Sequence, residues 1–196
     1  MRPTSLNTQN KITEKEPKKS NFQKLLELII CTMFGSLMFC SKQIMALLPN
    51  IHLLGMLIMV VTVCFRSKAL VSIYIFVFLE GLLGGFSLWW IPYLYVWTVL
   101  WGITMLIPKR TPNKAKMVIY PIICALHGFA FGILYSPGQA LLFGLNLEGT
   151  IAWIITGLPY DAIHGTSNFI TGFLIYPLSE LLKKLVYNNK IAKNNS

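Results

Sequence analysis

Apolar runs close to 18 residues long recur along this chain, and they constrain its fold more than any other feature. Each is long enough to cross about 30 Å of hydrocarbon as a helix. Only 12% of the 196 residues are charged, whereas an ordinary soluble domain carries about 25%. A lipid-embedded chain must satisfy its backbone hydrogen bonds internally, which favours helices. The sequence therefore predicts an all-α membrane protein.

Six apolar segments are expected to form transmembrane helices. They cover residues 25–47, 51–65, 69–88, 92–106, 117–135 and 162–182. The second and fourth connections carry Lys and Arg, whereas the first, third and fifth carry none. Because cations are retained on the cytoplasmic side, this alternation predicts a six-helix bundle with both termini in the cytoplasm. Sixteen of the 17 cations thus indicate topology, and no nucleic-acid partner is expected.

The expected domain organisation is a single membrane unit with polar extensions. Residues 1–24 are polar and of mixed charge, which indicates a disordered cytoplasmic leader. The six-helix membrane domain covers residues 25–185. Residues 186–196 form a cytoplasmic tail.

A further apolar stretch, 141–158, is interrupted by Asn146, Glu148, Gly149 and Gly157. If it crossed the membrane, the lysines of the tail would lie outside. We therefore expect an interfacial or re-entrant segment on the outer face, before the last helix. A seventh span is the alternative.

One cation, Lys42, lies within the first apolar segment. An unpaired ammonium there would cost about 3 kcal/mol, so such a residue reaches the interface, pairs with a carboxylate or faces a water-filled cavity. Two acids lie at a comparable depth, Glu80 and Asp161. The sequence predicts that Lys42 pairs with one of them.

Several polar side chains lie in or beside apolar segments, namely His52, His127, His164, Asp161 and Asn168. Polar groups in such positions usually face the bundle interior or a cavity, and a structural hydrogen bond is the alternative for each histidine. Asp161 and His164 have a spacing found in metal sites. No third ligand is identifiable, so no metal is expected.

The stretch GFSLWWIPYLYVW, residues 85–97, holds three tryptophans and two tyrosines without a charge. Trp and Tyr concentrate at membrane interfaces, which explains some of these rings. Aromatic side chains beside a few polar groups also line small-molecule pockets. We expect Trp89, Trp90, Tyr93 and Trp97 to contribute to such a pocket on the outer face.

These features together resemble the S components of energy-coupling factor (ECF) transporters. The resemblance rests on LLPNIHLLGMLIMVVTVCF, on ALVSIYIFVFLEGLLGGFSLWWIPYLYVW and on GLPYDAIHGTSNFITGFLIYPLSELLKKL, and it covers residues 25–185. It implies a substrate-binding subunit of the bacterial cytoplasmic membrane. Such a subunit captures a vitamin or related micronutrient and works with a transmembrane T subunit and two cytoplasmic ATPases. No P-loop motif occurs in this chain, and no cofactor is expected.

The resemblance also implies where ligand and partner bind. Ligand contacts would come from the first outer turn, the third connection and the last helix. The expected substrate-binding residues are Lys42, Asn50, His52, Glu80, Trp89, Trp90, Tyr93, Trp97, His127, Asp161, His164 and Asn168.

The T subunit would dock on small residues of the first helix, because small side chains allow helices to approach closely. Here these are Cys31 with Gly35, and Ser36 with Cys40, in place of the alanines that family members commonly carry.

Two other functions are compatible with the sequence. A self-sufficient transporter would usually show internal repeats, and none is evident. An intramembrane enzyme could use Asp161, His164, His52 and Glu80 as acid–base groups. No HExxH or GxSxG motif accompanies them, and we expect no enzymatic activity.

Overall fold

The computed structural model describes residues 20–48 and 50–187, and every regular element among them is a helix. The predicted all-α class is confirmed for these residues. Most of the expected leader and tail lies outside them. The α-helices are α1 (Asn21–Ile44), α2 (Leu54–Phe65), α3 (Ala69–Gly84), α4 (Tyr93–Leu106), α5 (Asn113–Phe129), α6 (Phe131–Phe143), α7 (Leu147–Gly172) and α8 (Ile175–Tyr187). Short 3-10 helices are η1 (Met45–Leu47), η2 (Arg66–Lys68) and η3 (Leu88–Trp90).

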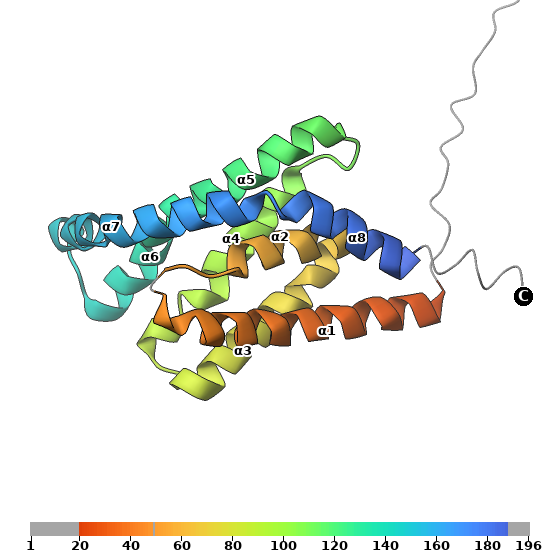
Figure 1. Cartoon of the computed structure of the whole chain (residues 1–196). Coiled ribbons are helices and arrows are strands. Elements are labelled where there is room, and N and C mark those ends of the chain that lie inside the picture. The colour runs from red at the N-terminus through yellow and green to blue at the C-terminus, as the bar shows by residue number, and fades with distance from the viewer. Residues whose placement is uncertain (1–19, 49, 188–196) are drawn as a thin grey trace, which may run out of the picture.

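Among the residues that the structure describes, three helical stretches are long and apolar enough to cross a membrane, judged by length and composition. They are Asn21–Leu47, Leu54–Gly84 and Asn113–Phe143. The second contains a chain reversal, because Arg66 has a φ of 54° and α2 and α3 pack on each other as a hairpin (Figure 1).

The helices run between two ends of the bundle (Figure 1). At the basic end, Lys68 Nζ lies 2.9 Å from Glu27 Oε2, and Arg66 Nη2 donates to the carbonyl of Met105 at 2.7 Å. The opposite end holds the aromatic stretch, and we call it the aromatic end. Helices α1, α3 and α5 run from the basic end to the aromatic end, and α2, α4 and α7 with α8 return.

Helix α2 forms the centre of the bundle. It packs against α1, α3, α4, α5, α7 and α8, and its residues Leu54 to Thr62 are all buried. Its 12 residues span only about 18 Å at 1.5 Å per residue. A helix surrounded by other helices buries its apolar surface against them, so its length need not match the thickness of a bilayer.

The outer surface of the bundle is apolar and its interior is partly polar. Phe22 and Met33 of α1 are 70% and 65% exposed, whereas Glu27 of the same helix is 1% exposed. Glu80 and His164 are also buried. Large exposed apolar surfaces are uncommon on soluble monomers, whereas buried ionisable groups inside an apolar shell are typical of membrane bundles.

The fifth predicted segment, 117–135, lies within the apolar helical stretch Asn113–Phe143, but a break at Ala130 divides that stretch into α5 and α6. A break of this kind frees backbone N–H groups of the next helix. The Gly132 N–H donates to Asp161 Oδ2 at 3.0 Å, so α7 supplies the missing acceptor. A Cβ at Gly132 would meet that same carboxylate. Asp161 therefore stabilises the start of α6.

Replacing Gly132 with alanine is expected to lower the free energy of unfolding by about 2 kcal/mol, because the buried Asp161 carboxylate loses its partner. Gly102→Ala is the matched control, since Gly102 lies in α4 with open space around it. An added methyl there should be neutral or stabilising. Thermal unfolding of both variants in detergent is the measurement. Equal melting temperatures would contradict this role of Asp161.

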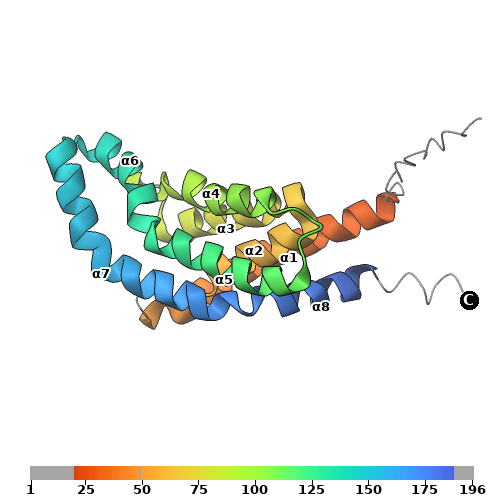
Figure 2. The same ribbon diagram turned by 90° about the horizontal axis from the view of Figure 1, so that it is seen from above.

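Residues 141–158, expected as an interfacial segment, are divided between the end of α6 and the beginning of α7. Gly144, with a φ of 65°, ends α6 in the left-handed conformation. The Asn146 side chain accepts the Gly149 N–H at 2.8 Å and caps α7. Helix α7 contains Pro159, and it bends sharply before it joins the bundle (Figure 2). Its N-terminal part and α6 thus extend beyond the other helices at the aromatic end.

The third predicted segment, 69–88, extends beyond the end of helix α3. Helix α3 ends at Gly84 because Gly85 has a φ of 83°, which favours glycine. Trp89 and Trp90 follow in η3. This turn directs the aromatic stretch back over the end of the bundle.

Candidate functional site

A cavity of about 380 Å³ lies at the aromatic end, between the end of α1, the α1–α2 connection, α3, α4, α6 and α7. It brings together residues that lie more than 120 positions apart in the sequence, from Lys42 to His164. Seven of the twelve predicted substrate-binding residues line it, namely Lys42, Asn50, His52, Glu80, Tyr93, Trp97 and His164.

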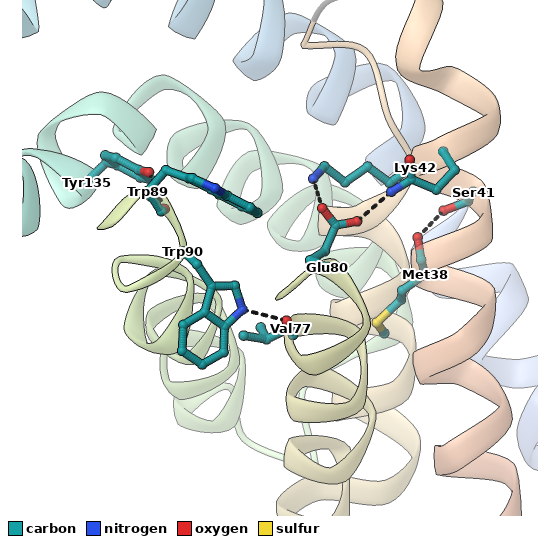
Figure 3. A network of polar contacts seen from close by, with 9 residues as sticks. Met38, Ser41, Lys42, Val77, Glu80, Trp89, Trp90 and Tyr135 are labelled. Atoms are coloured by element: carbon teal, nitrogen blue, oxygen red, sulfur yellow. Dashed lines mark hydrogen bonds and ion pairs between the residues drawn. The ribbon is translucent and has the colours of Figure 1, made fainter. Parts of the chain in front are cut away.

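The charged part of this cavity is an ion pair between Lys42 of α1 and Glu80 of α3. Glu80 Oε1 also accepts a hydrogen bond from Gln43 Nε2 at 2.9 Å, and Figure 3 shows the carboxylate held between two nitrogen donors. The Lys42 ammonium lies 5.0 Å from the centroid of the Tyr93 ring, within range of a cation–π interaction. The predicted pairing of Lys42 with Glu80 or Asp161 is thus resolved in favour of Glu80.

Trp97 is the centre of the aromatic part. Its side chain is 1% exposed, and its ring lies 5.7 Å from both Tyr93 and His127 and 5.4 Å from Phe131. The His52 ring, which also lines the cavity, lies 6.2 Å from the Trp97 ring. These separations are typical of edge-to-face and tilted aromatic packing. The rings therefore form one connected wall.

Several buried polar atoms beside the cavity have no hydrogen-bond partner within the part of the chain that the structure describes. They include His52 Nδ1, Trp97 Nε1 and His164 Nε2. The rings of His52 and His164 are 4.7 Å apart. Native proteins seldom leave buried polar atoms without partners, so these nitrogens point to hydrogen bonds with something other than the protein.

His52 lies in the connection before α2. Burial, and after it the nearby charge of Lys42, lowers the pKa of His52 to about 4. The imidazole is therefore neutral at physiological pH and presents one donor and one acceptor nitrogen. Together with the indole N–H of Trp97, it equips the cavity to bind both acceptor and donor groups.

Two of the predicted aromatic residues do not line the cavity. Trp90 Nε1 donates to the carbonyl of Val77 at 2.7 Å, so its polar atom is already satisfied within the protein (Figure 3). The Trp89 ring packs on Tyr93 with 5.6 Å between centroids, and its carbonyl accepts a hydrogen bond from Tyr135. Trp89 thus packs against a residue of the cavity wall, and Trp90 joins η3 to α3.

His127, Asp161 and Asn168 are also outside the lining. His127 Nε2 lies 3.1 Å from the Val96 carbonyl, and its ring packs on Trp97 from the bundle interior. Asn168 Nδ2 donates to the Cys124 carbonyl at 3.2 Å, joining α7 to α5. Asp161 binds the backbone of α6, as described above. These residues make structural hydrogen bonds, which was the alternative considered for His127.

Eight lining residues were missed by sequence reasoning, and Gln43 and Phe131 are the polar and the aromatic one among them. Gln43 follows Lys42 directly, and its polarity in an apolar segment was an available signal. Phe131 lies 5.0 Å from His164 and 5.9 Å from Tyr135 by ring centroids. It enters the cavity because the chain breaks at Ala130, a feature without a clear signal in the sequence.

The predicted docking residues separate into two pairs. Cys31 and Gly35 are buried against α3, where Ser72 Oγ donates to the Cys31 carbonyl at 2.6 Å and a Cβ at Gly35 would lie 2.8 Å from Ile75. Ser36 and Cys40 are exposed on the outer side of α1. Only the second pair is accessible to another protein.

Within the described residues, no group of three or more His, Cys, Asp or Glu side chains is arranged to hold a metal ion. Comparisons with family models, with curated proteins and with solved structures give no match to this chain. The candidate site is therefore identified from the geometry of its residues and not from a relative.

Proposed function

We propose that this chain is the S component of an ECF-type transporter, and that the cavity at the aromatic end binds a vitamin or related micronutrient. The observation that carries the proposal is the cavity itself. Its buried His52, Trp97 and His164 nitrogens have no partners in the described protein, and they surround a space of about 380 Å³. A small molecule with polar groups on an aromatic ring would satisfy the nitrogens and stack on the wall.

In this proposal the bundle makes six membrane passes: α1, α2, α3, α4, α5 with α6, and α7 with α8. The basic end faces the cytoplasm, as the positive-inside rule requires, and the cavity opens on the outer face. The short helix α2 is accommodated because neighbouring helices surround it. The bend of α7 leaves the first part of α7, together with the end of α6, at the outer interface.

The charge balance of the cavity favours a ligand of low net charge. Lys42 and Glu80 neutralise each other, and His52 is neutral. A strongly anionic ligand would have to separate Lys42 from Glu80, which leaves a buried carboxylate without its ion-pair partner. A neutral or singly charged ring system is the class that the lining suits.

The T subunit would dock on the exposed side of α1 at Ser36 and Cys40. Their spacing of four residues places them on one helix face, and small side chains allow a partner helix to approach closely. The ATPases would supply the energy for uptake, and this chain would supply substrate recognition.

Reconstitution in liposomes distinguishes this proposal from the other two functions. We expect the purified chain to bind a ring-bearing vitamin from a radiolabelled panel and to accumulate none of it. Uptake should require a T subunit and two ATPases in the same vesicles. Accumulation of the vitamin by the chain alone would indicate a self-sufficient transporter. Chemical conversion of the bound molecule by the chain alone would indicate an enzyme.

A further inference from the structure

A second cavity, of about 510 Å³, lies at the basic end of the bundle. Its lining comes from α1, α2, η2, α4, α5, α8 and the connection between α4 and α5. Six cations contribute to it, namely Lys24, Arg66, Lys68, Lys109, Lys116 and Lys183. Glu27 is the one acid in the lining that the structure describes.

The internal contacts of these residues leave positive charge directed at the cavity. Glu27 accepts hydrogen bonds from Lys68 Nζ at 2.9 Å and from the Tyr187 hydroxyl at 2.8 Å, so it balances Lys68. Lys183 Nζ pairs with Glu180 Oε1 at 2.8 Å, an acid outside the lining. Arg66 donates to the Met105 carbonyl, and Lys116 lies 3.4 Å from Asn113 Oδ1. Carbonyl and amide oxygens carry no net charge. The charges of Arg66 and Lys116 are thus not neutralised by these contacts.

We propose that this cavity binds a phosphate group, with the headgroup of an anionic phospholipid as the occupant that its position favours. A guanidinium matches the geometry of phosphate oxygens, and lysines add attraction without strict geometry. Basic pockets between membrane helices on the cytoplasmic side are suited to anionic headgroups. Val63, Phe65 and Ile107 give the cavity an apolar side next to the cations, which suits the glycerol and first methylenes of a lipid.

Topology alone would place cations at this end, but it does not require them to converge on one cavity. Lys114 and Lys184 allow cations outside the cavity lining to be compared with cations that belong to it. They belong to the same helices as Lys116 and Lys183, α5 and α8, and they are exposed and absent from the lining. Removing either pair changes the charge of the chain equally, and Glu180→Gln controls for the ion pair that Lys183 makes with Glu180. A difference between the two lysine pairs that Glu180→Gln does not reproduce therefore reports the cavity.

The test uses the full chain in detergent and measures bound lipid by native mass spectrometry during titration with phosphatidylglycerol or phosphatidylcholine. We expect phosphatidylglycerol to bind at least about tenfold more tightly than phosphatidylcholine. The Lys116→Gln/Lys183→Gln variant should lose about tenfold of that affinity, and Lys114→Gln/Lys184→Gln should stay within about twofold of the wild type. Circular dichroism melting confirms that both variants are folded.

A competition with millimolar inorganic phosphate separates the two sources of the phosphate group. Displacement of phosphatidylglycerol indicates that the cavity recognises the phosphate alone, so that a free anion is a competent occupant. Retention of the lipid indicates that the glycerol and acyl parts also contribute. Equal binding of both lipids, or equal losses in the two variants, would overturn the proposal and assign these cations to topology alone.

Discussion

Glu80→Gln is expected to lower the free energy of unfolding by about 3 kcal/mol, because the Lys42 ammonium loses its carboxylate in a largely buried site. The side chains of Glu80 and Lys42 are 5% and 25% exposed, so water screens the pair only in part. The expected loss therefore lies at the lower end of the free-energy costs found when a buried ion pair is broken. Denaturation of the purified chain in mixed micelles measures it.

Two further variants make this prediction specific. Glu180→Gln removes the carboxylate of a pair with Lys183 whose side chains are 40% and 34% exposed, and it should cost less than about 1 kcal/mol. Lys42→Gln/Glu80→Gln removes both charges and should recover most of the loss. Equal costs for Glu80→Gln and Glu180→Gln, or a double variant less stable than Glu80→Gln, would show that the pair is not a buried structural element.

Trp97→Phe is expected to weaken ligand binding about tenfold or more, equivalent to about 1.4 kcal/mol. The change keeps an aromatic ring in the wall but removes the indole N–H, which has no partner in the described protein. A ligand acceptor that meets this N–H would be left unsatisfied in a buried site. Isothermal titration calorimetry with the bound molecule measures the loss.

Trp90→Phe is the matched control for this change. The Trp90 indole N–H is already bonded to the Val77 carbonyl, and the residue lies outside the cavity lining. Its replacement should leave ligand affinity within about twofold, although stability falls by about 1 kcal/mol for the lost hydrogen bond. If Trp90→Phe weakened binding as much as Trp97→Phe, the assignment of the site to this cavity would be wrong.

The general architecture was predictable because it follows from solvation. Long apolar runs predict helices, and the cost of an isolated charge predicts that Lys42 has a partner. The choice of Glu80 over Asp161 was not predictable, since both acids lie at a similar depth in the sequence. It depends on how α1 packs against α3. Asp161 instead accepts the Gly132 N–H, and this contact depends on a helix break that no residue pattern predicts.

The candidate site was predictable as a region and not as a set of side chains. The residues 85–97 place many rings at one end of the bundle, and Tyr93 and Trp97 line the cavity. Trp89 and Trp90 have the same chemistry but face other partners, because Gly85 turns the chain and η3 orients them. Which ring faces a cavity depends on such local geometry, and composition does not determine it.

The most direct test of the central claim is native mass spectrometry of the chain purified from cells grown in rich medium. We expect one small molecule bound per chain in the wild type and in Trp90→Phe, and its loss from Trp97→Phe at the same protein concentration. The mass of the released molecule would identify the ligand. The account would be contradicted by a ligand retained equally in Trp97→Phe, or by a chain that carries none and shows no tryptophan quenching with any ring-bearing vitamin.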